Sequence, residues 1–125
     1  MQETAAKPPR TEQNSGILDF LEGTSCHGDL ASLLLRHFEL DRDVSVYCPD
    51  WPGFGYVLCH VNRSVFAACA GMRDIAVRVP GSRLRFRLEP FAGIGPDWWR
   101  LPAQHPDFGL VLDDARNAAA NRQPS

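Results

Sequence analysis

Six of the twelve arginines of this chain lie between residues 73 and 100, and their guanidinium groups are well suited to bind an anion. The same segment has three acidic residues, whereas residues 1–72 carry nine acidic and five basic residues, so charge is polarised along the chain. Arginine and tryptophan are also the residues enriched where proteins meet. We therefore predict one binding surface, with these six members: Arg78, Arg83, Arg85, Arg87, Trp98 and Trp99.

A strand expected over residues 83–88 is the centre of this surface. Arginine alternates there with Leu84, Phe86 and Leu88, and an alternating strand presents the two sets on opposite faces. The surface favours a non-enzymatic interaction or regulatory domain, whose partner would be another protein or a second copy of the chain. Nucleic acid is a less favoured partner because the formal net charge is −2. An outer sheet face of solvated or locally paired arginines would have the same pattern.

The loop expected between Pro90 and Pro96 gives a second hypothesis. It contains Gly93 and Gly95 and follows the basic strand, so it could cover a bound anion. The alternative function is therefore a small anionic-ligand-binding protein, or an enzyme, with a pocket under residues 91–97. The sequence has no G-x-S-x-G, Walker A, H-E-x-x-H or G-x-G-x-x-G pattern, and we predict no catalytic residue and no cofactor.

Four cysteines and two Cys-His dipeptides raise the question of a metal or thiol site. Structural Zn²⁺ takes four Cys or His ligands, but the chain has no C-x₂-C pair. Cys59 and His60 would also point to opposite faces of a strand. With no export signal evident, the favoured interpretation is free, mostly buried thiols and no metal. A thiol or metal site would require members of one set to converge: Cys26, Cys48, Cys59 and Cys69.

Length and composition indicate a single soluble domain. The chain has 125 residues, of which 44% are hydrophobic and 22% charged, as is ordinary for a globular protein. No run approaches the roughly 18 apolar residues of a membrane span, so we expect a cytoplasmic protein with no membrane partner. The polar composition predicts a disordered leader over 1–14 and a frayed tail over 121–125, on either side of a domain at 15–120.

Local patterns place these residues on helices, then on strands in series, then on a final helix. Ser15 is expected to cap a helix over 17–22, and Asp29 a second helix that ends near Leu40. Asn62 and Arg63 join two strand-like runs and predict a hairpin. The expected turns, strands and last helix span these ranges: turn 49–53; strands 44–48, 56–61, 64–70, 74–79, 83–88 and 98–101; helix 109–119. This order predicts a two-layer α+β fold around a largely antiparallel sheet of five to six strands.

The hairpin and the later strands resemble a known family. The parts that are similar to TfoX N-terminal and MmcQ/YjbR-like domains lie within residues 44–120: Phe54–Ala67, Ile75–Pro80, Gly95–Pro102 and Ala115–Ala120. The Met-Phe-Gly-Gly opening of the TfoX type is replaced here by Pro52-Gly53-Phe54-Gly55, and a strand is expected over 83–88 where the family has a helix or loop. The resemblance implies a compact α+β domain with a curved antiparallel sheet. It brings no catalytic residues, and it implies a link to competence regulation or DNA binding.

Overall fold

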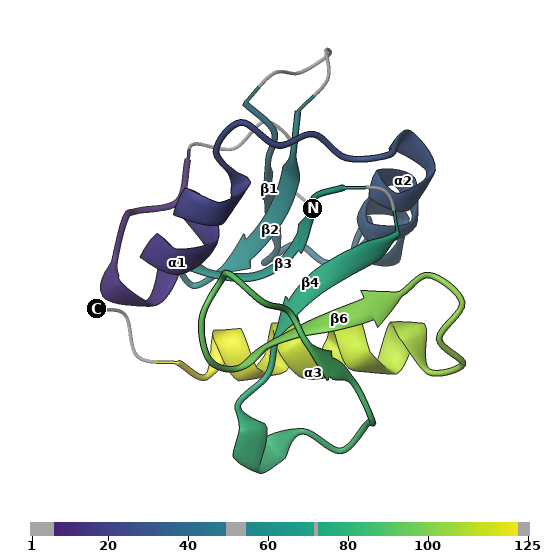
Figure 1. Ribbon diagram of the computed structural model, residues 1–125. Coiled ribbons are helices and arrows are strands. Elements are labelled where there is room, and N and C mark those ends of the chain that lie inside the picture. Colours follow the sequence, from purple (N-terminus) through teal and green to yellow (C-terminus); the bar gives the residue numbers. More distant parts are fainter. Residues whose placement is uncertain (1–6, 50–54, 72, 123–125) are drawn as a thin grey trace.

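A computed structural model describes residues 7–49, 55–71 and 73–122, and it contains a six-stranded sheet with helices on both faces (Figure 1). The elements follow one another in this order: α1 (Glu12–Leu21), α2 (Gly28–His37), β1 (Ser45–Tyr47), β2 (Val57–Val61), β3 (Ser64–Cys69), β4 (Asp74–Arg78), the short 3-10 helix η1 (Gly81–Arg83), β5 (Glu89–Pro90), β6 (Trp98–Pro102) and α3 (Phe108–Ala120). The strands are arranged β1-β2-β3-β4-β6-β5, and every neighbouring pair is antiparallel. The predicted α+β class and antiparallel sheet are therefore confirmed.

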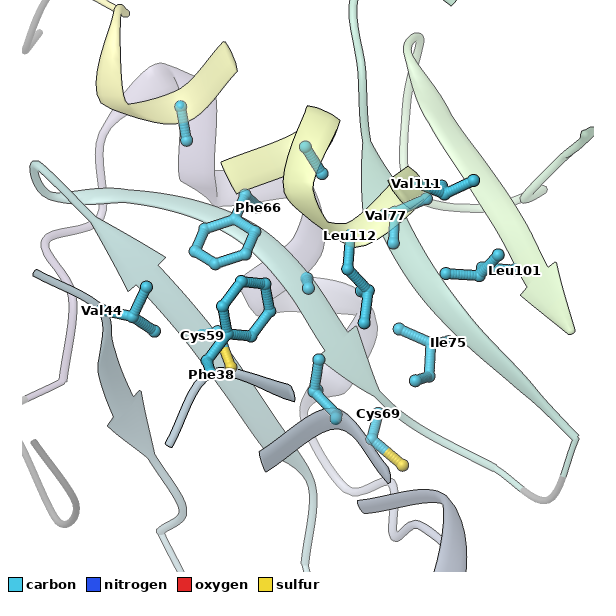
Figure 2. Close-up of a cluster of buried hydrophobic side chains, with 14 of the residues drawn as sticks. Phe38, Val44, Cys59, Phe66, Cys69, Ile75, Val77, Leu101, Val111 and Leu112 are labelled. Atoms are coloured by element: carbon cyan, nitrogen blue, oxygen red, sulfur yellow. The ribbon is translucent and has the colours of Figure 1, made fainter. Parts of the chain in front are cut away.

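The larger core lies between one face of the sheet and helices α2 and α3. Helix α3 buries Val111, Leu112 and Ala115 because these residues share one side of a helix. Figure 2 shows Leu112 among side chains that project from the strands. The ring of Phe38, just after α2, packs edge-on against Phe66 of β3 with 5.3 Å between the ring centroids. This packing holds α3 across β3 and β4.

A smaller core lies on the opposite face, beneath α1 and the segment 91–94. Ile17 and Leu21 of α1 are fully buried there, together with Trp98 of β6. Figure 1 shows α1 and α2 on opposite sides of strands β1 to β3. The sheet therefore has a partial third layer in addition to the two that the sequence predicts.

The structured part of the chain begins earlier and ends later than the sequence predicts. Thr11, not Ser15, caps the first helix, since its side chain accepts a hydrogen bond from the main-chain N–H of Asn14. Asn14 is fully buried, so the prediction of disorder is wrong for residues 11–14. At the other end Arg122 is half-buried and hydrogen-bonded. Residues 7–10 of the predicted leader form no helix or strand, and residues 1–6 and 123–125 lie outside the described residues.

Helix α2 is also shifted relative to its prediction. Its cap is His27, whose Nδ1 accepts a hydrogen bond from the N–H of Asp29, whereas the sequence predicts Asp29 as the cap. The helix ends at His37 rather than near Leu40, which is 90% exposed. Composition could not identify the cap, because an imidazole nitrogen is an uncommon acceptor in that position.

The central hairpin forms as the sequence predicts. Asn62 and Arg63 connect β2 and β3 with φ angles of 51° and 65°, the two positive values that a two-residue type I′ turn requires. The strands at 45–47, 57–61, 64–69, 74–78 and 98–102 match their predicted ranges closely. The predicted turn over 49–53 falls, apart from Pro49, outside the described residues.

The predicted strand over residues 83–88 is wrong. Gly81–Arg83 form the 3-10 helix η1, and the chain from there pairs with β6 only at Glu89 and Pro90. The alternation of side chains nevertheless persists: Leu84, Phe86 and Leu88 pack against the larger core, and the arginines between them are exposed. Alternation of polar and apolar residues thus indicates which side chains are buried, and it can occur in a segment that is not hydrogen-bonded to a neighbouring strand.

Candidate functional site

The six residues of the predicted surface do not lie on one surface. Arg78 and Trp98 face each other across β4 and β6, on the side of the sheet that α1 covers. Trp98 is only 4% exposed, so it is a core residue. Trp99 points to the opposite face, where it is half-buried and its indole N–H donates to the carbonyl of Val79 over 2.9 Å. Neither tryptophan is therefore an exposed anchor.

The remaining three arginines form an exposed ridge beside α3, which we call the arginine ridge (Arg83, Arg85 and Arg87). Arg85 makes a bidentate ion pair with Asp114 of α3, with N–O distances of 2.7 and 2.9 Å. Arg83 and Arg87 are exposed and form no ion pair within the described part of the chain. The depression beside Arg83 and Arg85 has a volume of about 200 Å³, which is small for a ligand site.

A larger groove lies under the 91–97 loop, where the second hypothesis expects a pocket. Its volume is about 430 Å³. The first turns of α1 form one wall, and the segment from Ile94 to Trp98 forms the other. Gly93, Gly95 and Asp97 all have positive φ angles, which lets the loop bend sharply back toward α1. Among the residues that line this groove, Arg78 is the only cation.

The guanidinium group of Arg78 is half-buried and incompletely paired. Its Nη1 donates to the main-chain carbonyl of Gln13 over 2.9 Å. Its Nε is buried and has no hydrogen-bond partner among the described residues. Burial lowers the pKa of Arg78, and the nearby Asp97 carboxylate partly opposes this effect. The carboxylate of Asp97 is itself engaged, since its Oδ1 accepts the N–H of Gly81 over 3.0 Å.

A second guanidinium group lies close to Arg78. Arg122, just beyond α3, is half-buried, and its Nη1 donates to the hydroxyl of Ser64 over 2.7 Å. Burial first, and then the positive charge of Arg78, lower the pKa of Arg122 to about 10. Both groups remain charged at neutral pH. Two cations thus share this end of the sheet with Asp97, while the exposed Glu12 adds a negative charge at the rim of the groove.

One buried side chain holds this end of the molecule together. The amide of Asn14 donates to the carbonyls of Pro9 and Arg63, each over 2.9 Å. Its Oδ1 accepts the N–H of Val65 over 3.0 Å. These bonds attach α1 to the β2–β3 turn and so position the carbonyl of Gln13 that binds Arg78. We call Arg78, Arg122 and Asp97, with this groove, the arginine-pair site.

The opposite end of the sheet has a second groove of about 410 Å³, beside Phe91. Arg100 lies there with its guanidinium carbon 4.1 Å from the centre of the Phe91 ring, and it forms an ion pair of 3.2 Å with Asp74. Arg73 and Phe20 also line the groove. Asp74 therefore offsets one of the two arginine charges that line this groove.

The cysteines converge only in part. Cys26 and Cys69 come within hydrogen-bonding contact of each other, although they are far apart in the sequence. Cys59 is fully buried on the same face of the sheet, and Cys48 is half-buried. All four are free thiols. The described residues contain no group of three or more His, Cys, Asp or Glu side chains placed to hold a metal ion.

The sequence predicts a role for Arg78 and a pocket under the 91–97 loop, and both stay predictions, whereas two residues of this region were not predicted at all. Arg122 falls in the predicted tail, and Asn14 falls in the predicted leader. The only sequence signal for Arg122 is that it follows an apolar helix. Asn14 could have been noticed as a polar residue one helical turn before Leu18, but its three partners belong to segments that only the fold brings together.

Comparison with protein-family models, with curated proteins and with solved structures finds no match to this chain. The resemblance to TfoX N-terminal and MmcQ/YjbR-like domains therefore stays a prediction. None of the helices in the described part of the chain is long and apolar enough to cross a membrane.

Proposed function

We propose that this protein binds a small anion, carrying a phosphate or carboxylate group, at the arginine-pair site. The observation that carries the proposal is that two half-buried guanidinium groups, Arg78 in the groove and Arg122 outside its lining, lie near enough for their charges to interact, with the engaged carboxylate of Asp97 acting on both. The alternative function from the sequence expects a pocket under residues 91–97, and residues 94–97 of that loop line this groove, whereas Phe91 and Gly93 do not.

The buried positive charge of Arg78 is not fully compensated by its neighbours. Withdrawing a guanidinium group from water costs free energy unless its N–H groups and its charge are satisfied. Arg78 leaves Nε without a partner and is close enough to Arg122 for the two charges to repel. An anion bound in the groove beside Arg78 would offset the repulsion between the two positive charges.

The walls of the groove limit what the anion can be. Ile94, Pro96 and Trp98 provide apolar surface, and a volume of about 430 Å³ suits a small organic molecule. The hydroxyl of Ser15, the one hydroxyl in the lining, already donates to the carbonyl of Glu12. The lining provides no pair of nucleophile and base, so we propose binding without catalysis. The free thiols further favour a reducing compartment, and we place the protein in the cytoplasm.

Thermal unfolding in the presence of inorganic phosphate tests the proposal. At about ten times the dissociation constant, a ligand of the native state stabilises it by about 1.4 kcal/mol, or roughly 5 °C in Tm for a domain of this size. Arg78→Gln and Arg122→Gln should each remove most of this shift. Arg87→Gln changes the same side chain at an exposed, unpaired position and should keep it.

Two comparisons separate specific binding from a general salt effect. Sodium chloride at matched ionic strength should raise Tm much less than phosphate does. Arg78→Lys retains the charge but loses the fork of N–H donors, and it should bind phosphate with intermediate affinity. An equal phosphate shift in Arg78→Gln and in the unaltered protein would show that the anion binds elsewhere.

A second candidate function uses the arginine ridge as a contact for an acidic protein surface or for a second copy of the chain. The observation that favours it is that Arg83 and Arg87 are exposed cations with no ion-pair partner among the described residues. The double change Arg83→Glu/Arg87→Glu leaves the Arg85–Asp114 pair in place. Sedimentation at low and high salt should show an assembly that this double variant loses; a monomer under all conditions contradicts self-association.

A further inference from the structure

The segment between α1 and α2 is attached to the sheet at Cys26. The N–H of Gly71 donates to the carbonyl of Ser25 over 2.7 Å, and the N–H of His27 donates to the carbonyl of Gly71 over 3.0 Å. These bonds make Cys26 and Gly71 an isolated parallel bridge. The N–H of Cys26 also donates to the carbonyl of Gly55 over 3.2 Å. Cys26 is therefore held at a defined place beside the end of β3.

This attachment brings the thiol of Cys26 against that of Cys69. Both side chains pack in the larger core, so they lie on the same face of the sheet. The two thiols are close enough to interact. Cys69 is fully buried at the margin of the large core, where Figure 2 draws it, while Cys26 remains half-exposed.

The environments of the two thiols differ in a way that assigns them different roles. The hydrogen bond from Cys69 lowers the pKa of Cys26 to about 7, burial opposes this effect, and the N–H of Val57 assists it. The pKa of Cys69 is raised by the same hydrogen bond and by burial. Cys26 is therefore both the more accessible and the more readily ionised thiol of the pair, and Cys69 is the protonated thiol behind it.

We propose that Cys26 and Cys69 are a redox pair that a small peroxide converts into an intramolecular disulfide. The Cys26 thiolate attacks one oxygen of hydrogen peroxide, the O–O bond breaks, and the product is a Cys26 sulfenic acid with one water after proton uptake. The Cys69 sulfur then attacks the Cys26 sulfur, the S–O bond breaks, and the hydroxyl leaves as a second water with the Cys69 proton. Two electrons pass from the two thiols to the peroxide.

Access and geometry are compatible with both steps. Ser25 lines the groove beside Phe91, and His27 lines a neighbouring groove of about 380 Å³, so that Cys26 lies between two openings. The two sulfur atoms must approach to an S–S distance of about 2.05 Å, and the residues on either side of Cys26, Ser25 and His27, are exposed. The disulfide would then fasten the α1–α2 connection to β3, at the opposite end of the sheet from the arginine-pair site.

Peptide mapping after oxidation tests the proposal directly. The reduced full-length protein is treated with hydrogen peroxide, remaining thiols are alkylated, and the chain is cut with trypsin. Cleavage after arginine gives three cysteine peptides, each identifiable by mass: 11–36 with Cys26, 43–63 with Cys48 and Cys59, and 64–73 with Cys69. A cross-link of 11–36 to 64–73, with the loss of two hydrogen atoms, is the expected product.

Three variants assign the roles. Cys26→Ser should abolish the cross-link. Cys69→Ala should form the sulfenic acid more slowly, because it removes the main cause of the lowered Cys26 pKa, and should leave that sulfenic acid unresolved, so that dimedone traps it on peptide 11–36. Cys48→Ser removes the other half-buried thiol and should form the cross-link at a rate within about twofold of the unaltered protein.

Other products would overturn the proposal. A cross-link that involves peptide 43–63 would assign the chemistry to Cys48 or Cys59, and dimedone labelling of the unaltered protein without any cross-link would show that Cys69 does not resolve the sulfenic acid. The mapping needs no variant, so it remains decisive even if Cys69→Ala fails to fold. Because no arginine of the arginine-pair site takes part, this proposal stands or fails independently of anion binding.

Discussion

At the scale of single residues, the most consequential side chain outside the candidate site is Asn14. It is fully buried, and it satisfies two carbonyls and one N–H on two separate segments, the chain before α1 and the β2–β3 turn. A buried amide with all its hydrogen bonds formed specifies one arrangement of the surrounding chain, because every alternative leaves polar groups unpaired. Asn14 therefore determines how α1 sits on the β2–β3 turn, and hence where Gln13 meets Arg78.

Asn14→Ala is expected to lower the free energy of unfolding by about 3 kcal/mol, since it leaves the N–H of Val65 and two carbonyls unsatisfied in a buried place. Urea unfolding followed by tryptophan fluorescence measures the change. Asn117→Ala is the matched control, because Asn117 is exposed on α3 and the change should stay within about 0.5 kcal/mol of zero. Equal losses in the two variants would mean that the Asn14 bonds contribute little.

The sequence singles out some of the residues discussed here and gives no sign of others. Arg78 was identifiable because it follows an apolar run in a basic segment. Arg122 and the Cys26–Cys69 contact were not, because each depends on chain segments that pack together only in the folded protein. Composition identifies residue types with useful chemistry, but burial and neighbouring charge decide which of them are poised to use it.

At the scale of elements, the pattern of buried side chains was more predictable than the backbone. Strands β2, β3 and β4 are well marked because β-branched and aromatic residues alternate or run together between turn residues. Residues 84–88 have equally clear alternation but lack a partner strand, which no local pattern can supply. The cap at His27 and the early start of α1 at Glu12 likewise depend on tertiary contacts.

The approach of α1 to the 94–98 segment gives a test of the groove at this scale. A Cβ atom placed on Gly16 would lie 2.3 Å from the carbonyl oxygen of Ile94, so Gly16→Ala must push α1 and the loop apart. We expect a loss of about 1–3 kcal/mol, although alanine is the better helix former. Gly28→Ala, at the start of α2 with open space around it, should be neutral or slightly stabilising in the same urea titration. A stabilised Gly16→Ala variant would contradict the close contact.

A substitution at Arg63 in the β2–β3 turn is expected to stabilise the protein. Arg63 has a φ angle of 65°, which costs a side chain with a Cβ atom about 1 kcal/mol and costs glycine almost nothing. Arg63→Gly should therefore raise the Tm. The increase is reduced because glycine also gives the unfolded chain more conformational freedom. Arg63→Ala removes the same side chain without relieving the backbone. Comparable melting temperatures for the two variants would show that the turn is not strained.

At the scale of the whole molecule, the fold separates two kinds of chemistry. The ends of β3 and β4 that carry Cys69 and Asp74 lie opposite the ends that carry Ser64 and Arg78, because the strands are antiparallel. One end of the sheet thus holds the thiol pair, and the other holds the arginine-pair site. The segment 91–98 passes along both grooves and is the structural connection between them.

The shifted pKa values of the thiols make the free energy of unfolding depend on pH, and they determine whether it rises or falls in each pH range. The pKa of Cys26 is lowered to about 7 in the folded protein from 9.0, so the unfolded chain binds the extra proton between pH 7 and 9, and stability rises with pH across that window. This contribution is lost as the pH falls through 7. No charged side chain causes the lowering of the pKa, which comes from Cys69 and the N–H of Val57 against the opposing effect of burial.

Above pH 9 the dependence should reverse. Burial raises the pKa of Cys59 to about 12, and the pKa of Cys69 is raised as well, so the folded protein retains protons that the unfolded chain releases. We expect urea midpoints, measured with a reductant from pH 7 to 10.5, to pass through a maximum near pH 9. In the Cys26→Ser variant the increase in the urea midpoint between pH 7 and 9 should disappear. The decrease above pH 9 should remain, because the buried thiols of Cys59 and Cys69 are still present. A Cys26→Ser curve parallel to that of the unaltered protein would show that Cys26 ionises as an ordinary thiol, and the redox pair would then lack its attacking thiolate.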